Sequence, residues 1–308
     1  MITSVFSKSN PVNYVVVSLT VVVFFVINEW QLHTLQTSAF SFLSSLSKIF
    51  MLIAYLFLAN FICKRNNLTK DNAYVFLYLG FFLILIPQCL SDLRLIAANF
   101  FVMLAFRRIL SLKSMTATKE KIFDASLWIF VASLFHFWCI LFIILVFVAI
   151  FFHVVNDFRS WFLPVLAFLT VAILLAAFCL ITEQPYFENI YSQIEFQFSF
   201  RYFTSKVESA VMVLFVLFSI STLVYYLIGI NKKPASAQNN IFKIIVTWFI
   251  ALSILIISPQ KSNALLVFAL LPTSVFVSDF LENSPSNWFK EFVSWVFVST
   301  AVVLFVFN

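Results

Sequence analysis

The chain has 308 residues, of which 63% are hydrophobic and only 10% are charged, and its formal net charge is +6. Soluble domains carry roughly 25% charged residues, and an apolar excess of this size would give a water-soluble protein an aggregating surface. The composition therefore excludes a soluble globular protein and predicts an integral membrane protein. Residues 1–308 are expected to form one membrane domain, because no stretch between the apolar segments is long enough for a soluble domain.

Apolar segments with the length of a membrane span, about 20 residues, recur along the whole chain. In chain order the predicted spans are 12–28, 40–63, 73–90, 93–108, a long block at 122–152, and then 160–181, 207–230, 241–257, 264–281 and 292–307. The predicted fold class is an all-α polytopic transmembrane bundle with about ten or eleven membrane segments. Asp279 and Glu282 end a span and are expected to cap it on the cytoplasmic side.

The apolar block 122–152 decides the predicted topology. As one helix it would be about 46 Å long at 1.5 Å per residue, well beyond the roughly 30 Å hydrocarbon core, whereas two passes would each be short. With the N-terminus in the cytoplasm, a single pass moves Lys232, Lys233 and Lys243 to the outer face. The positive-inside rule therefore favours two short passes or a deep re-entrant hairpin. The turn is expected near residues 133–136, although that stretch has neither Gly nor Pro.

The two-pass topology places the cations Arg94, Arg201, Lys206 and Lys261, together with His136, at the outer face. Cations are depleted on that face, so those that remain need a ligand or a structural partner. Arginine offers planar bidentate contacts to phosphate oxygens, and a histidine deep in an apolar block is costly unless it has a partner. The alternatives are an interfacial Arg94 paired with Asp92, and a structural His136 bonded to a neighbouring hydroxyl or carbonyl.

The segment 182–206 alternates aromatic and apolar residues with polar ones. Glu188 and Glu195 lie within it, and a sugar site combines such carboxylates with aromatic rings. Anchoring of the loop at the membrane interface by its aromatic residues is the alternative. Glu183, Glu188 and Glu195 are candidate bases, and nothing in the sequence selects one of them. Glu188 and Glu195 are also candidate contacts to an acceptor glycan.

Several classes of function are not supported by any motif. The chain contains no HExxH, P-loop or GxSxG motif, and its 3 histidines lie on different segments. Neither a metal nor another cofactor is predicted. The basic charge is explained by cytoplasmic loops, so no nucleic-acid partner is expected, and the membrane lipid is the expected surrounding partner.

Two family resemblances add to this description. Residues 1–13, 107–112 and 121–125 resemble an uncharacterised family of polytopic inner-membrane proteins from Gram-negative bacteria. The segments Leu93-Arg94-Leu95-Ile96-Ala97-Ala98 and Ala132-Ser133-Leu134-Phe135-His136 are similar to the Wzy/EpsG-like polysaccharide polymerases, in which an Arg opens one membrane helix and a Phe-His follows on a later one. This chain departs from the polymerase pattern at Leu95, where a Gln is usual, and has only Lys261 in place of a late Arg.

The second resemblance implies an enzyme that joins lipid-linked sugar repeats at the outer face of the bacterial inner membrane. It implies Arg94 and His136 as catalytic residues, with Arg94 and Lys261 at the pyrophosphate of a polyprenyl-linked glycan. Arg201 and Lys206 are further candidate substrate contacts. The alternative is a non-enzymatic membrane subunit or scaffold of an envelope machine, and a lipid or sugar flippase is a third possibility.

Overall fold

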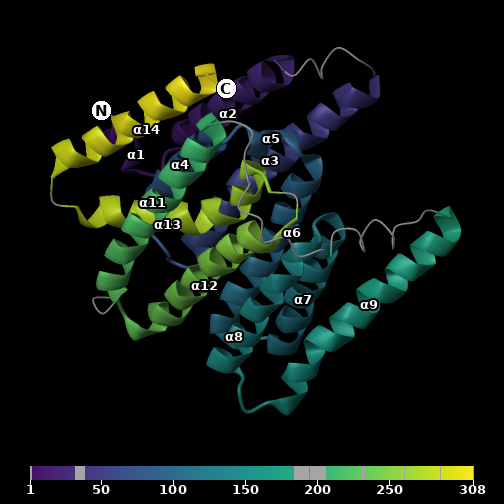
Figure 1. The fold of residues 1–308 in the computed structure, drawn as a ribbon. Coiled ribbons are helices and arrows are strands. Elements are labelled where there is room, and N and C mark those ends of the chain that lie inside the picture. The colour runs from purple at the N-terminus through teal and green to yellow at the C-terminus, as the bar shows by residue number, and fades with distance from the viewer. Residues whose placement is uncertain are drawn as a thin grey trace.

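The computed structural model describes residues 2–31, 39–183, 194, 206–230, 233–259, 261–284 and 286–307, and the regular structure within them is helical (Figure 1). The α-helices are α1 (Ile2–Phe6), α2 (Pro11–Gln31), α3 (Ala39–Arg65), α4 (Tyr74–Leu85), α5 (Gln88–Ser91), α6 (Leu93–Ser111), α7 (Thr118–Phe135), α8 (Ile143–His153), α9 (Phe158–Thr182), α11 (Lys206–Ile228), α12 (Ala235–Ile257), α13 (Val267–Asn283) and α14 (Asn287–Phe307). Short 3₁₀ helices are η2 (Leu112–Ser114), η3 (Phe137–Phe142) and η5 (Asn263–Leu266).

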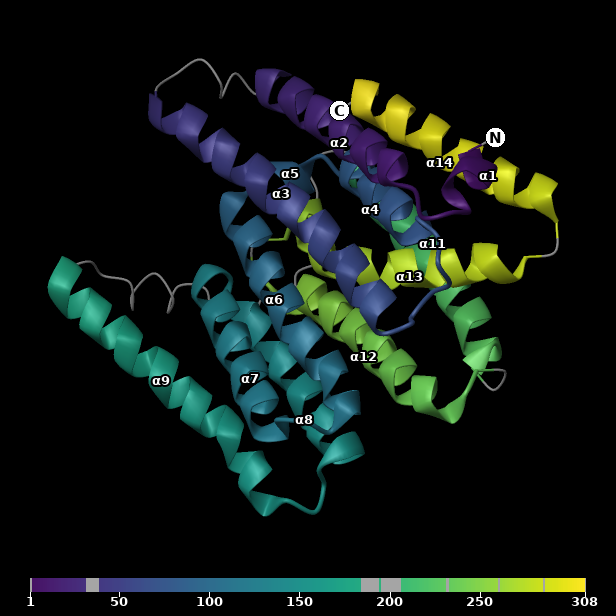
Figure 2. The same ribbon diagram turned by 180° about the vertical axis from the view of Figure 1, so that it is seen from behind.

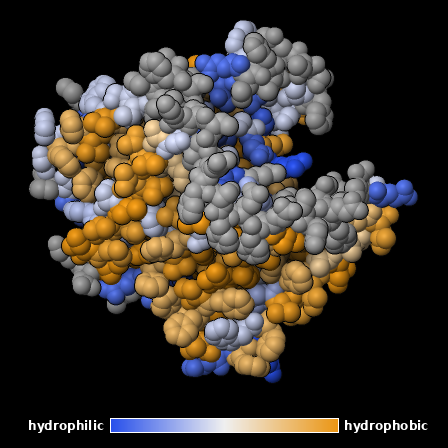
Figure 3. Space-filling model, viewed as in Figure 1, coloured by the Kyte–Doolittle hydropathy of each residue, from blue (hydrophilic) through white to orange (hydrophobic). Residues whose placement is uncertain are grey.

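The predicted all-α membrane fold is confirmed. Within the described part of the chain, 7 helices are long and apolar enough to cross a membrane, and Tyr74–Leu85 and Phe137–His153 are shorter apolar helices. The apolar surface fits this assignment, because orange side chains cover much of the visible face in Figure 3. The larger number of ten or eleven membrane segments remains a prediction.

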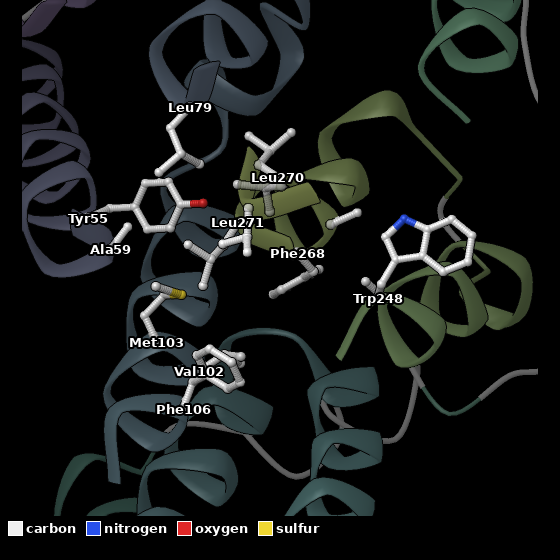
Figure 4. Packing of buried hydrophobic residues seen from close by; sticks show 14 of the residues in the cluster. Tyr55, Ala59, Leu79, Val102, Met103, Phe106, Trp248, Phe268, Leu270 and Leu271 are labelled. Atoms are coloured by element: carbon white, nitrogen blue, oxygen red, sulfur yellow. The ribbon is translucent and has the colours of Figure 1, made fainter. Parts of the chain in front are cut away.

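Helices α13 and α4 form the centre of the bundle. The most apolar stretch of α13 is 94% buried, and nearly all of α4 is buried against α2, α3, α13 and α14. Figure 4 shows Tyr55 of α3 and Leu79 of α4 directed toward Leu270 and Leu271 of α13. Because α4 has 12 residues, it is about 18 Å long at 1.5 Å per residue and is too short to cross a hydrocarbon core alone.

Proline and aspartate residues set several helix boundaries. Pro11 begins α2, a position where its missing N–H costs no hydrogen bond. Asp92 and Asp157 cap α6 and α9, and their carboxylates accept from the backbone N–H of the second residue along. The span predicted at 73–90 is wrong in its second half, because α4 ends at Leu85 and a separate short helix, α5, begins after Pro87.

The block 122–152 folds as a helical hairpin, as the charge distribution predicts. Helix α7 ends at Phe135, His136 is extended with φ −143° and ψ 108°, and η3 and α8 lead back along α7. At the open end of the hairpin, an ion pair of 3.4 Å joins Lys119 Nζ at the start of α7 to Asp157 Oδ2 just after α8. His136 therefore lies at the opposite end of the hairpin from these two residues.

The helix connections gather at two ends of the bundle, which we call the basic end and the Arg94 end. At the basic end, hydrogen bonds and ion pairs join the α3–α4 connection to α13, α6 to α7, and the α11–α12 connection to α13. Cations at the basic end include Lys64, Arg65, Arg107, Arg108, Lys113, Lys119, Lys121, Arg159, Lys233 and Lys290. The Arg94 end holds the first residues of α6, the last of α7 and the connection between α12 and η5.

Helix α9 lies at the edge of the bundle. It packs mainly along α7 and diverges from the other helices in both views (Figures 1 and 2). Only 11% of its most apolar stretch is buried, and side chains such as Leu180 and Ile181 are exposed. Such a helix is stable only with lipid or protein against its outer surface, which agrees with a membrane environment.

Candidate functional site

A cavity of about 260 Å³ opens at the Arg94 end of the bundle, and we call it the Arg94 pocket. Its walls come from three separate segments: the start of α6, the turn between α7 and η3, and the connection from α12 to η5. The lining residues are Asp92, Arg94, Leu95, Phe135, His136, Lys261, Ser262 and Leu265. Three of the predicted site residues, Arg94, His136 and Lys261, therefore share one pocket.

Arg94 is positioned by the cap of α6. Its backbone N–H donates to Asp92 Oδ1 at 2.8 Å, which fixes the first turn of the helix. The Arg94 side chain is exposed, and its guanidinium makes no ion pair with any residue that the structure describes. The guanidinium gives this wall of the pocket a positive charge, and the Asp92 carboxylate at the N-terminus of α6 offsets part of it.

His136 is held by the hairpin turn. Its backbone N–H donates to Ala132 O at 3.1 Å, and its carbonyl accepts from Cys139 N at 3.0 Å. The imidazole stacks on Phe268 with ring centroids 6.0 Å apart. Its Nε2 atom is buried and has no hydrogen-bond partner within the described ranges. A buried unpartnered ring nitrogen is costly, so this atom is suited to a ligand contact.

The third wall of the pocket is anchored to neighbouring helices. Asn263, two residues after Lys261, donates through Nδ2 to the carbonyl of Glu208 at 3.0 Å, which ties the start of η5 to α11. The Cys89 thiol lies 3.7 Å from Asn263 O and 3.6 Å from Ala264 O, which ties η5 to α5. These contacts place Lys261 and Ser262 opposite the start of α6.

The pocket combines two cations with a carboxylate and an imidazole. Arg94, Lys261 and Asp92 supply the charged groups, and Ser262 adds a hydroxyl. This donor-rich set suits an oxyanion, because arginine and lysine both bind phosphate oxygens. Phe135 provides an apolar wall and continues into a stack with Phe101 and Trp128, with centroid separations of 5.5 Å and 5.6 Å. The arrangement can bind an anionic headgroup that carries an apolar chain.

The other predicted site residues are not placed in this pocket. Lys206 is the first residue of α11, and its side chain is outside what the structure describes. Glu188, Glu195 and Arg201 lie outside the described residues altogether. Their predicted contacts to substrate therefore stay predictions.

A larger cavity of about 750 Å³ lies at the basic end, where sequence reasoning placed no site. Asp279 and Glu282, expected only to cap a span, line it together with Lys233 and Gly229. The available signal was the spacing of the two acids: residues three apart share one face of a helix, here at the end of a span with no other charge.

Comparison with known proteins identifies the family but no activity. The chain belongs to a family of unknown function, DUF6427, which it matches over residues 1–308. No curated protein and no solved structure matches the chain.

Proposed function

We propose that this family member binds the pyrophosphate of a polyprenyl-linked glycan in the Arg94 pocket and takes part in the assembly of an envelope polysaccharide. One observation carries the proposal: Arg94, His136 and Lys261 come from three segments far apart in the sequence and line a single cavity. A fold that gathers scarce cations of the Arg94 end around one pocket favours a phosphate-bearing ligand.

In this proposal Arg94 and Lys261 hold the two phosphate groups. A cavity of about 260 Å³ is below the range of pockets that enclose drug-sized ligands, so it suits a charged headgroup rather than a whole glycan. The sugar would extend out of the pocket, and the polyprenyl chain would leave past Phe135 toward Phe101 and Trp128.

The enzyme version of the proposal is a polymerase-like glycosyl transfer. A hydroxyl of the acceptor glycan attacks C1 of the donor sugar, the bond between C1 and the pyrophosphate oxygen breaks, and polyprenyl pyrophosphate leaves. His136 Nε2 accepts the hydroxyl proton, since this atom has no protein partner among the described residues. Arg94 and Lys261 stabilise the charge that develops on the leaving pyrophosphate.

The proposed location is the bacterial inner membrane, with the N-terminus in the cytoplasm. The gathering of most basic connections at one end supports a cytoplasmic assignment for the basic end. The Arg94 pocket then faces the outside. We also propose that the segment between α9 and α11 brings Glu188, Glu195, Arg201 and Lys206 to an acceptor glycan.

A non-enzymatic membrane subunit is the second candidate. It is favoured by Asp92, whose carboxylate lies in the same pocket as Arg94 and Lys261 and lowers the net positive charge available to a phosphate. In that case the pocket would be part of an interface with another envelope protein.

The test is glycan chain length in cells that produce Arg94→Ala in place of the wild type. We expect elongation of the surface glycan to be lost while the amount of membrane-inserted protein is unchanged. Arg159→Ala, an exposed cation at the basic end, is the matched control and should leave chain length intact. Normal glycan length in the Arg94→Ala strain would reject the proposal.

A further inference from the structure

The cavity of about 750 Å³ at the basic end, which we call the Asp279 pocket, is built from two connections, the end of α13 and Lys113 of η2. Residues 66–71 between α3 and α4 form one side, residues around Gly229 and Lys233 between α11 and α12 form another, and the end of α13 forms the base. Its volume is within the range of pockets that bind small organic molecules. It lies at the other end of the bundle from the Arg94 pocket, so its ligand is distinct from the one proposed for that pocket.

Asp279 provides an unused hydrogen-bond acceptor inside this pocket. The residue is 3% exposed, and its Oδ1 pairs with Lys233 Nζ at 2.7 Å. Its Oδ2 is buried and has no partner among the residues that the structure describes. An unpartnered buried carboxylate oxygen costs free energy unless a donor reaches it, so the pocket calls for a ligand with N–H or O–H groups.

Gly229 leaves space beside that oxygen. A Cβ atom at this position would lie 4.0 Å from Asp279 Oδ2, in ordinary contact with it. The backbone does not require glycine here, because no glycine of the chain has positive φ. The absent side chain therefore matters for access to Asp279 rather than for the local conformation.

The charges at the base of the pocket favour a cation. Glu282 lies one turn after Asp279, and its Oε1 accepts from Asn72 Nδ2 at 2.6 Å and from Lys70 N at 3.0 Å. Lys233 pairs with Asp279 only, and Lys70 acts on Glu282 at longer range, while the C-terminal ends of α11 and α13 add negative potential. Lys233 also shows how an ammonium is held here, since its Nζ lies 4.2 Å from the centroid of the Tyr226 ring.

The rim of the pocket carries two lysines and one acid. Lys70 and Lys113 both line it and both are exposed, and the exposed Asp71 beside them pairs with Lys64 at 3.2 Å. Neither Lys70 nor Lys113 forms a salt bridge in the part of the chain that the structure describes. Carboxylates at the base and lysines at the rim match a ligand whose ammonium and anionic groups are separated by a short linker.

We propose that the Asp279 pocket binds an ethanolamine phosphate group, with its primary ammonium on Asp279 Oδ2 and Glu282 and its phosphate between Lys70 and Lys113. The group could belong to a phosphatidylethanolamine headgroup or to a free phosphoethanolamine. A trimethylammonium group is excluded from this binding mode because it has no N–H to donate to Asp279 Oδ2.

The test uses the full chain in phosphatidylcholine nanodiscs, titrated calorimetrically with phosphoethanolamine and with phosphocholine. We expect saturable binding of phosphoethanolamine and at least tenfold weaker binding of phosphocholine, since a hydrogen bond to a buried charged group is lost. In a second experiment, native mass spectrometry of protein purified from membranes measures whether phosphatidylethanolamine stays bound. Binding in either experiment identifies the source, and binding in neither overturns the proposal.

Single substitutions test the carboxylates at the base of the pocket and the lysines at its rim independently. Asp279→Asn should abolish phosphoethanolamine binding, and Gly229→Ala, which keeps every charged group, should weaken it. Lys113→Gln should weaken binding of phosphoethanolamine but leave binding of ethanolamine unchanged. Asp124→Asn, an acid of the basic end that pairs with Arg108 outside the pocket, is the control and should bind normally. Equal affinities for phosphoethanolamine and phosphocholine, or unaltered binding in both Asp279→Asn and Gly229→Ala, would overturn the assignment.

Discussion

Lys119, in the first turn of α7, lies 3.4 Å from Asp157, the residue that caps α9, measured from Nζ to Oδ2. This ion pair joins the start of α7 to the residues that follow α8, at the open end of the α7–α8 hairpin. It follows that His136, at the tip of the hairpin, lies at the far end of the bundle beside Arg94 and Lys261. The composition of the Arg94 pocket therefore depends on the hairpin.

The first prediction concerns this topology. Single cysteines placed at Ser262 and at Arg159, in a background without the native cysteines, should react with a membrane-impermeant maleimide from opposite sides of the membrane. The reason is that position 262 lines the Arg94 pocket, while position 159 lies beside the capping Asp157 at the basic end. Labelling of both positions from the same side would contradict the two-ended arrangement.

A second prediction concerns the contact between α2 and α4. A Cβ added to Gly80 would lie 2.5 Å from Val17 Cγ1, and Val21 Cγ2 at 3.5 Å blocks the neighbouring space. Valine has little rotamer freedom in a helix, so α2 must move. Gly80→Ala should destabilise the purified protein by about 1–3 kcal/mol, measured from unfolding in mixed micelles.

The companion experiment is the double variant Val17→Ala with Gly80→Ala. Removing the valine methyl groups creates room for the new Cβ. The loss in free energy of unfolding of the double variant should therefore be smaller than the sum of the losses of the two single variants. Strict additivity would show that the two residues do not meet.

A third prediction concerns the buried Lys243 of α12. Its ammonium is fully buried and lies 2.8 Å from His153 Nε2, 3.2 Å from Ile109 O and 3.3 Å from Asn240 Oδ1. His153 and Ile109 link α12 to the ends of α8 and α6, and Asn240 lies in α12 itself. Lys243→Met leaves the acceptors without their donor and should lower the free energy of unfolding by about 1–3 kcal/mol.

Lys113→Met, at an exposed lysine of the same end, is the matched control and should leave the free energy of unfolding nearly unchanged. If Lys243→Met unfolds no more easily than this control, the three contacts contribute nothing to the bundle.

Much of the fold could be predicted from the sequence, because apolar length and polar turns mark a membrane helix clearly. The predicted spans 160–181 and 292–307 agree with the cores of α9 and α14. The break at His136 followed from the placement of lysines and arginines, since no Gly or Pro marks it. The predicted span 73–90 was wrong in its second half, where Pro87 separates α4 from α5.

The two pockets differ in how far the sequence could reveal them. Arg94 and His136 stand out because a charge and an imidazole are rare in an apolar setting. The spacing of Asp279 and Glu282 marks one face of a helix, but the pocket itself could not be predicted, because it depends on Gly229, the α3–α4 connection and the end of α13 meeting in space. No local sequence pattern indicates that these three segments lie together.

The most direct test of the Arg94 pocket is binding of farnesyl pyrophosphate, a short polyprenyl pyrophosphate, to the purified full chain in nanodiscs. We expect saturable binding of farnesyl pyrophosphate to the wild type. Binding should be at least tenfold weaker in Arg94→Ala and in Lys261→Ala, because each variant loses charged hydrogen bonds to phosphate. Binding should be unchanged in Arg159→Ala. Equal affinity in the wild type, Arg94→Ala and Lys261→Ala would contradict the account.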